Sequence, residues 1–356
     1  MRTVLFAAGI SLATALILPV GNNDFPAYWI AGQRLIADRN PYALAEILSE
    51  EMTQFGVAPG VALNPPWSVA VFYPLGRLSY NHAQRLWTAL MVFAWFLSVE
   101  IARQLYAPHF RTPTAWMMAC VFSPFTAMVG TGQMSSLILL GVLSFVWNIN
   151  RGREVEAGIC LYLVALKPQL AYLVWPLLLL WTIKTQRWKI IAAFAVTVTA
   201  ISIAAMAVHP PIFSEYLHLW THETTATQAF PTLGGLLRVA TGIGWMQIVP
   251  MLLALAWLAC RRFDGWQRAM PSLLAVSVAT SPYGWFFDQV VAFPSIMERV
   301  RGWRSAAIIM IVNVVTLVMI AAHSKGFWYA WTGIAWVAFY FGAPYLEPKL
   351  KRCPQR

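Results

Sequence analysis

Runs of apolar residues, separated by short polar stretches, repeat along almost the whole chain. A membrane-spanning helix needs about 20 largely apolar residues, although shorter spans occur. This pattern predicts an all-α polytopic membrane protein, with ten to twelve transmembrane helices in a single integral membrane domain over residues 1–356. The predicted spans are 4–20, 86–105, 113–129, 134–150, 157–166, 168–183, 190–208, 246–260, 269–281, 286–297, 305–322 and 327–345.

Composition and charge agree with this interpretation. Hydrophobic residues make up 59% of the chain and charged residues 11%, whereas a soluble domain has about 25% charged residues. The net charge of +11 does not indicate a nucleic-acid partner, because the basic residues lie in short loops between apolar runs. With a cytoplasmic N-terminus, 18 of the 25 lysines and arginines fall on the cytoplasmic side. This follows the positive-inside rule, and we expect both termini to be cytoplasmic.

The cysteines and the N-terminal segment change the prediction little. The four cysteines are scattered without a CxxC pair, so we expect neither a disulfide framework nor a metal site. The first apolar segment resembles a signal peptide in composition. It lacks a clear A-x-A cleavage site, however, and we expect it to be an uncleaved first helix.

Two longer segments fall on the outer side. The first, residues 22–85, contains "DFPAYWIAGQRLIADRNPYALAEILSEEM", whose apolar positions recur at helical spacing and predict short amphipathic helices. Its later part, "LNPPWSVAVFYPLGRLS", is too short and too rich in proline to span, so we expect it to dip into the interface. The second outer segment covers residues 209–245.

Ionisable residues beside apolar spans are candidates for function, because hydrocarbon penalises charge. Asp24 directly follows the first predicted helix, in "PVGNNDFPAYW". A partly desolvated carboxylate at this place can act as a general base. The alternative is an ordinary helix N-cap, because aspartate favours that position and a helical pattern follows.

Lys167 lies between two short apolar runs, in "VALKPQLAYLVWP". Pro168 breaks the helix and frees backbone groups, which is tolerated in a membrane only inside the protein or along a cavity. A cation at such a break suits an anionic group such as a phosphate. The alternative is a lysine at a helix end whose amine reaches the membrane interface.

Further polar residues follow the same logic with weaker signals. Asp288, in "SPYGWFFDQ", is either a substrate contact or the ion-pair partner of an outer-side cation. Gln133, in "GTGQMSS", can form hydrogen bonds with a sugar or a phosphate. The alternative is that it belongs to a tight interhelical turn. The imidazoles of His218 and His222, with Glu223 beside them, have metal-ligand spacing on one helix face, but nothing else supports a metal.

Several classes of protein lack support in the sequence. There is no P-loop, no Rossmann glycine fingerprint and no Ser/His/Asp signature, so nucleotide-driven chemistry is not expected. A secondary transporter or lipid flippase fits the broken helix and the intramembrane charges. Against it stand the absence of a second "KPQ" region and the long first outer segment. A membrane scaffold with purely structural charges is a third alternative.

Five motifs together resemble a known family. The chain is similar to the polytopic glycosyltransferases of the glycosyltransferase-C superfamily, and most similar to glycosyltransferase family 87, the polyprenol-phosphate-mannose-dependent mannosyltransferases and their relatives. The matching strings, in chain order, are "DFPAYWIAGQRLIADRNPYA", "NPPWSVAVFYPLGRLS", "GTGQMSSLILL", "AGICLYLVALKPQL" and "SPYGWFFDQ". Many relatives carry histidine in the last motif, where this chain has Phe286, Phe287 and Asp288.

The resemblance implies a sugar donor carried on a polyprenyl phosphate, inversion at the anomeric carbon, and a lipid or glycan acceptor. We expect a bacterial inner-membrane enzyme whose active site faces the periplasm or the cell exterior. We expect no cofactor and no metal, because the leaving phosphate already carries its charge and a lysine can meet it. Asp24 matches the position of the catalytic base. The motif residues expected to contact the donor phosphate or sugar are Lys167, Gln133, Gln169, Asp288 and Tyr283.

Overall fold

The computed structural model describes residues 7–11, 13–14, 24–56, 62–222, 229–261 and 265–346. Within these ranges the regular structure is entirely helical, which confirms the prediction of an all-α polytopic membrane protein. The α-helices are α2 (Phe25–Ile36), α3 (Leu44–Phe55), α4 (Pro66–Val69), α5 (Tyr73–Gly76), α6 (Tyr80–Tyr106), α7 (Thr112–Cys120), α8 (Ser123–Thr131), α9 (Ser135–Ile149), α10 (Glu154–Ala165), α11 (Val174–Lys184), α12 (Trp188–Val208), α13 (Ile212–His222), α14 (Leu233–Thr241), α15 (Val249–Ala259), α16 (Trp266–Thr280), α17 (Phe293–Arg299), α18 (Trp303–Ala321) and α19 (Ala330–Leu346). Short 3-10 helices are η1 (Ala70–Phe72), η2 (Pro168–Ala171), η3 (Gly244–Ile248), η4 (Phe286–Ala292) and η5 (Gly326–Tyr329).

Three helices of the described residues, α6, α12 and α18, are long and apolar enough to cross a membrane. Helices α7 and α8 meet at a bend of 61° and would together make a fourth such span. The other predicted spans within the described ranges correspond to shorter helices, several of which join a 3-10 turn. Ten to twelve spans therefore remains a prediction, and most of the predicted span 4–20 lies outside the described residues.

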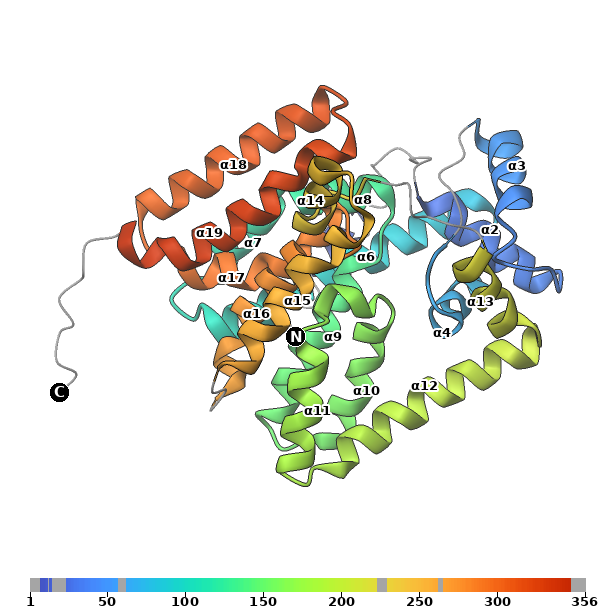
Figure 1. The fold of residues 1–356 in the computed structure, drawn as a ribbon, viewed down its shortest axis with the longest axis horizontal. Helices are drawn as coiled ribbons and strands as arrows, with labels where there is room; N and C mark the ends of the chain where they lie inside the picture. Colours follow the sequence, from blue (N-terminus) through green and yellow to red (C-terminus); the bar gives the residue numbers. More distant parts are fainter. Residues whose placement is uncertain are drawn as a thin grey trace.

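The helices form a bundle from which one group projects (Figure 1). Helix α9 packs against α6 and α10, and α10 packs in turn against α12. Helices α16, α17 and α19 pack together on the other side. Helices α2, α3, α4 and α13 gather near the C-terminal end of α12, so the two predicted outer segments meet in space.

Helix α2 is buried more completely than an amphipathic surface helix, with ten of its twelve residues inaccessible. It crosses α5 at Gly32 and Gly76, where a Cβ on either glycine would overlap the other segment's backbone. The Tyr28 ring stacks on Phe72 with centroids 4.4 Å apart. The first outer segment thus folds back on itself instead of lying flat at the interface.

Helix α3 does have the predicted amphipathic character, since only Ile47 and Glu51 on it are buried. The buried guanidinium of Arg34 fixes it to α2. Arg34 donates to Glu46 and, at 2.9 Å, to Glu50.

Candidate active site

Asp24 and Gln133 meet although 109 residues separate them. The Gln133 Nε2 group donates to Asp24 Oδ2 at 2.7 Å, and the Asp24 amide donates to the Thr131 carbonyl at 3.1 Å. Gly132 makes this approach possible. Its φ of +75° is left-handed, and a Cβ there would lie 2.8 Å from the Phe25 Cβ. The "GTGQ" motif therefore brings the start of α9 against the start of α2.

Asp24 occupies the N-cap position of α2, as the alternative interpretation expected, but its side chain makes no capping hydrogen bond. Its carboxylate is directed to Gln133 instead. Burial raises the pKa of this carboxyl, while the Gln133 hydrogen bond and the charge of Lys167 lower it by less. A carboxylate with a raised pKa and a hydrogen bond to its charged form is suited to accept a proton near neutral pH.

Lys167 lies inside the protein, with 5% of its side chain exposed. Its Nζ donates to Gln133 Oε1 at 2.7 Å and to Asp288 Oδ1 at 3.1 Å. It also lies 5.3 Å from the centre of the Phe287 ring. A lysine that reaches the membrane interface would expose its amine, so this alternative does not fit.

Asp288 has the contacts of an ion-pair partner, which was the alternative to a substrate contact. Its side chain is fully buried, and Oδ1 accepts from both Lys167 and Ser135. Its Oδ2 accepts the Trp285 amide at 2.9 Å. One chain of hydrogen bonds therefore runs from Asp24 through Gln133 and Lys167 to Asp288. We call these four residues the buried polar network.

The helix break at Lys167 is present as predicted, because α10 ends at Ala165 and η2 begins at Pro168. The carbonyls that the break frees find partners in the "NPPWS" motif. Leu166 O accepts from the Asn64 amide and the Ser68 hydroxyl, both at 3.2 Å. Ala165 O accepts from the Trp67 indole at 3.0 Å. Two motifs about a hundred residues apart therefore form one structural unit.

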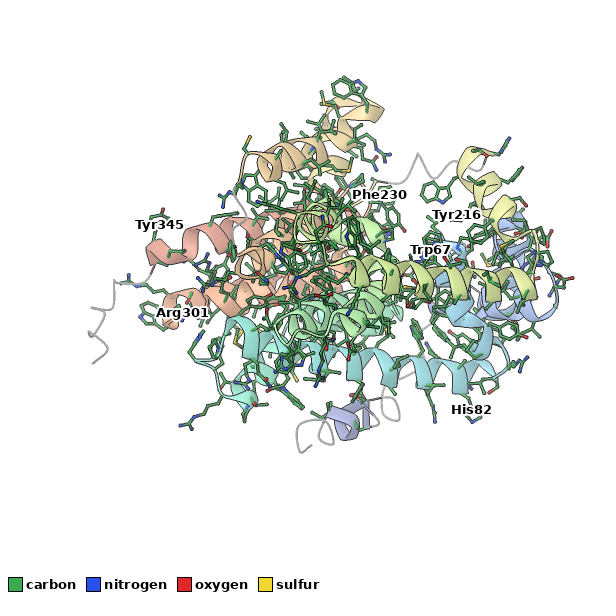
Figure 2. The ribbon with its side chains drawn as sticks, turned by 90° about the horizontal axis from the view of Figure 1, so that it is seen from below. Trp67, His82, Tyr216, Phe230, Arg301 and Tyr345 are labelled. Atoms are coloured by element: carbon green, nitrogen blue, oxygen red, sulfur yellow. The ribbon has the colours of Figure 1, made fainter. Side chains whose placement is uncertain are left out.

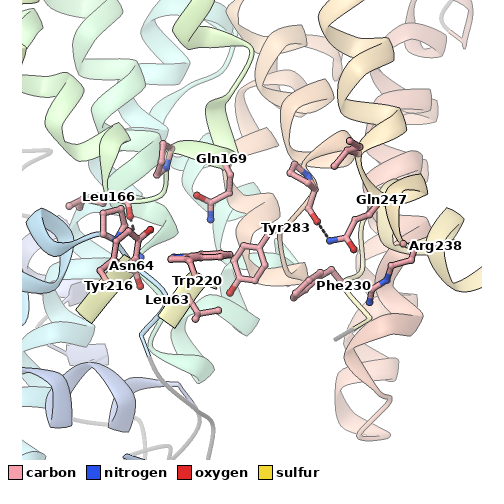
Figure 3. Close-up of a pocket in the computed structure, with 15 residues that line it drawn as sticks. Leu63, Asn64, Leu166, Gln169, Tyr216, Trp220, Phe230, Arg238, Gln247 and Tyr283 are labelled. Atoms are coloured by element: carbon pink, nitrogen blue, oxygen red, sulfur yellow. Dashed lines mark hydrogen bonds between the residues drawn. The ribbon is translucent and has the colours of Figure 1, made fainter. Parts of the chain in front are cut away.

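A cavity of about 560 Å³ lies beside the buried polar network, within the size range of small-molecule sites. Gln169 and Tyr283 line it, together with Leu166 and Pro168 on either side of Lys167. In Figure 3, Gln169 and Tyr283 lie between an end marked by Asn64 and an end marked by Arg238. The remaining lining comes mainly from α13, α14 and η3.

Tyr283 links the cavity to the buried polar network. Burial raises the pKa of its hydroxyl, and the charges of Asp288 and Asp24 raise it further. This ring therefore belongs both to the cavity wall and to the electrostatic surroundings of the carboxylates.

Sequence reasoning missed several residues of the site. Arg238 is the one charged residue among the described residues that line the cavity, but in the sequence it was only an outer-side basic residue. Asn64 was part of a motif without an assigned role. Ser135 and Tyr28 had no signal beyond their motifs, because a hydroxyl in an apolar run is common.

The histidine motif does not assemble a metal site within the described residues, where no group of three or more His, Cys, Asp or Glu side chains is arranged to hold a metal ion. His218 and His222 stack on α13 with ring centroids 4.4 Å apart. Both are exposed, and Glu223 lies outside the described residues.

The fold defines an all-helical polytopic membrane protein, in which Tyr283 joins a buried network of acid, amide and amine groups to a cavity of substrate size. The family model for glycosyltransferase family 87 matches residues 62–287, well over half of the chain, and the chain belongs to this family. It is therefore a membrane glycosyltransferase. No curated protein and no solved structure matches the chain. The matched range includes Gln133, Lys167 and Tyr283, begins after Asp24 and ends one residue before Asp288.

Proposed function

We propose that the protein transfers a sugar from a polyprenyl-phosphate carrier to a hydroxyl of a lipid or glycan acceptor, with inversion at the anomeric carbon. The sugar is a hexose such as mannose, or a pentose. The observation that carries the proposal is the partly buried Asp24 carboxylate, which Gln133 holds and whose charge acts on Tyr283 of the cavity wall. The one charged residue among the described residues that line this cavity is Arg238. An acid beside a cationic cavity supplies a base for the acceptor and a counter-charge for the leaving phosphate.

In the proposed reaction Asp24 takes the proton of the acceptor hydroxyl, and the acceptor oxygen attacks the anomeric carbon. The bond from that carbon to the phosphate oxygen breaks, and the polyprenyl phosphate leaves with the electron pair. Asp288 does not act as a nucleophile in this scheme, because Lys167, Ser135 and the Trp285 amide occupy both of its oxygens. One available carboxylate favours a single displacement, which inverts the configuration.

The leaving phosphate gains negative charge, and two cations are placed to stabilise it. Arg238 belongs to the cavity wall, and a guanidinium binds phosphate oxygens in a bidentate manner. Lys167 does not line the cavity, but its neighbours Leu166 and Pro168 do, so its positive charge lies close to the cavity wall. Asp288 compensates part of this charge. Gln169 and Tyr283 remain our candidates for contacts to the donor sugar.

We place the reaction on the outer face of a bacterial inner membrane, with both termini cytoplasmic. The distribution of basic residues between loops supports this orientation. So does the position of the cavity, which is lined from both predicted outer segments, by Asn64 of the first and Arg238 of the second.

Sugar transfer by the purified protein, reconstituted with polyprenyl-phosphate sugars and membrane-derived acceptors, tests the proposal. Asp24→Asn removes the base but keeps the shape, so we expect transfer to fall by about 10²–10⁴-fold. The matched control is Glu156→Gln, an exposed acid on α10, which should retain normal transfer.

Two results would contradict the proposal. Full transfer by the Asp24→Asn variant would remove the assignment of the base. Transfer from nucleotide sugars but not from any polyprenyl-phosphate sugar would remove the assignment of the donor. Uptake of a solute into liposomes without a glycosylated product would favour the transporter alternative.

A further inference from the structure

The Gln133 side chain is the only link that the hydrogen bonds of the described residues provide between Asp24 and the Lys167–Asp288 ion pair. We propose that Gln133 is a positioning residue, which holds the Asp24 carboxylate in one orientation and in its proton-accepting form by connecting it to Lys167. This inference rests on the proposed role of Asp24 as the base. It replaces the expectation that Gln133 binds the donor.

The orientation of the Gln133 amide follows from its neighbours. A lysine ammonium carries only donors, so the group of Gln133 that faces Lys167 at 2.7 Å must be the carbonyl oxygen. The amide nitrogen must then face the opposite way, toward Asp24, at 2.7 Å. The Tyr28 hydroxyl also donates to the Gln133 oxygen at 2.7 Å, which fixes the amide from a third direction. If the amide were inverted, its nitrogen would face the Lys167 ammonium, so that a donor met a donor. Its oxygen would face the Asp24 carboxylate, so that an acceptor met an acceptor.

Gln133 does not face the cavity. The residue is 6% exposed and does not line the cavity. Asp24 does not line the cavity either, but it is only half-buried and so is more accessible than Gln133. Its three side-chain hydrogen bonds all go to protein groups. A sugar or a phosphate therefore has no direct access to this amide, whereas a role in orienting Asp24 uses each of its contacts.

The electrostatic surroundings of Asp24 explain why such a connection matters. The groups that face it are the cation Lys167, the acid Asp288 and the phenols Tyr28 and Tyr283. Burial raises the pKa of Asp24 and Asp288 raises it further, while Gln133 and Lys167 lower it. A base must be ionised before it can accept a proton, so the hydrogen bond from Gln133 opposes the effect of burial.

The test is the pH dependence of kcat for sugar transfer, measured from about pH 5 to pH 9. Gln133→Leu removes the donor to Asp24, which favours the protonated acid. A hydrogen bond to a charged group contributes enough to move the acidic limb of the profile upward by about one to two pH units. KM for the donor should change less than twofold. Gln133→Glu keeps the size of the side chain but places a carboxyl against Asp24, and it should move the limb at least as far.

Gln289 provides the matched control. It is also a buried glutamine, but its oxygen accepts from Thr332 and Trp336, away from the buried polar network. Only the pH profile of Gln289→Leu is compared, so a loss of stability in this variant does not affect the comparison. Its pH profile should coincide with that of the wild type.

Three outcomes are separable. An upward shift of the acidic limb relative to the wild type in both Gln133 variants, but not in Gln289→Leu, supports the positioning role. A rise in donor KM with an unmoved limb would overturn it, since that result describes a substrate contact. Undiminished transfer by Asp24→Asn would instead remove the proposed function itself, independently of what the Gln133 variants do.

Discussion

At the scale of single residues, the sequence identified the members of the buried polar network but not their pairing. Asp24, Lys167 and Asp288 were recognisable because a charge beside an apolar span is costly and needs a reason. Their partners were not predictable, because Lys167 and Asp288 lie 121 residues apart and only the fold brings them together. Arg238 escaped notice for the opposite reason, since an arginine in a polar outer segment carries no such cost.

The Lys167–Asp288 pair leads to a prediction on stability. Removal of one member leaves the other charge buried without compensation, which typically costs about 3–5 kcal/mol. We expect Lys167→Met and Asp288→Leu each to lower the free energy of unfolding by about this amount. The double variant should lose less than the sum, because no charge then remains unpaired. Thermal unfolding of the four proteins in detergent measures the coupling, and strictly additive losses would show that the two groups do not stabilise each other.

At the scale of elements, the helix boundaries depended on prolines whose effect the hydropathy pattern does not reveal. Segment 113–129 was a single predicted span, but a new helix begins at Ser123 with Pro124 in its first turn, and the two helices meet at 61°. Segment 190–208, which contains no proline, was predicted almost to its ends and forms α12. A run of apolar residues thus indicates what is buried in a membrane more reliably than it indicates how straight the helix is.

Helix α13 has a connection to α2 that the sequence did not suggest. The His209 ring, 5% exposed, lies between Asp38 at 2.7 Å and Glu215 at 2.8 Å. The first of these contacts joins the end of α12 to the turn after α2, and the second holds the first turn of α13. Since Tyr216 and Trp220 of α13 line the cavity, this cluster sets the position of one cavity wall.

His209→Leu should therefore weaken donor binding more than it slows the chemical step. We expect KM for the donor to rise by about three- to tenfold, which corresponds to the loss of one or two net hydrogen bonds, with kcat changed less. Steady-state kinetics at one pH measure both quantities. His218→Leu on the exposed face of the same helix is the control. An unchanged KM in the His209 variant would show that the cavity wall does not depend on this cluster.

At the scale of the whole molecule, the distribution of charge predicts which parts of the chain lie on the same side of the membrane. In Figure 2, His82 and Tyr216 from the two predicted outer segments lie toward one end of the molecule. Arg301 from a predicted cytoplasmic loop, and Tyr345 at the end of the last predicted span, lie toward the other end. Both the number of spans and their direction remain predictions. Most predicted spans within the described residues are short helices, several of them joined to a 3-10 turn, and hydropathy alone does not give the length of each helix.

This orientation gives a prediction for labelling in intact cells. In a variant whose native cysteines are replaced by serine, His82→Cys should react with a membrane-impermeant maleimide added outside, once the outer membrane is opened. Arg301→Cys should react only after the inner membrane is made permeable. Both side chains are exposed in the structure, so the side of the membrane that the reagent reaches, and not burial in the protein, decides whether labelling occurs. The reverse pattern would invert the proposed topology.

The shared unit formed by the "NPPWS" motif and the helix break at Lys167 has a consequence for protein engineering. The carbonyls of Ala165 and Leu166 lack helical partners because Pro168 interrupts the helix. They accept hydrogen bonds instead from the side chains of Asn64, Trp67 and Ser68. The first outer segment is consequently not an interchangeable module. A chimera that exchanges this segment between family members has to transplant the residues around Lys167 together with it, or the grafted segment loses the groups on which it is anchored.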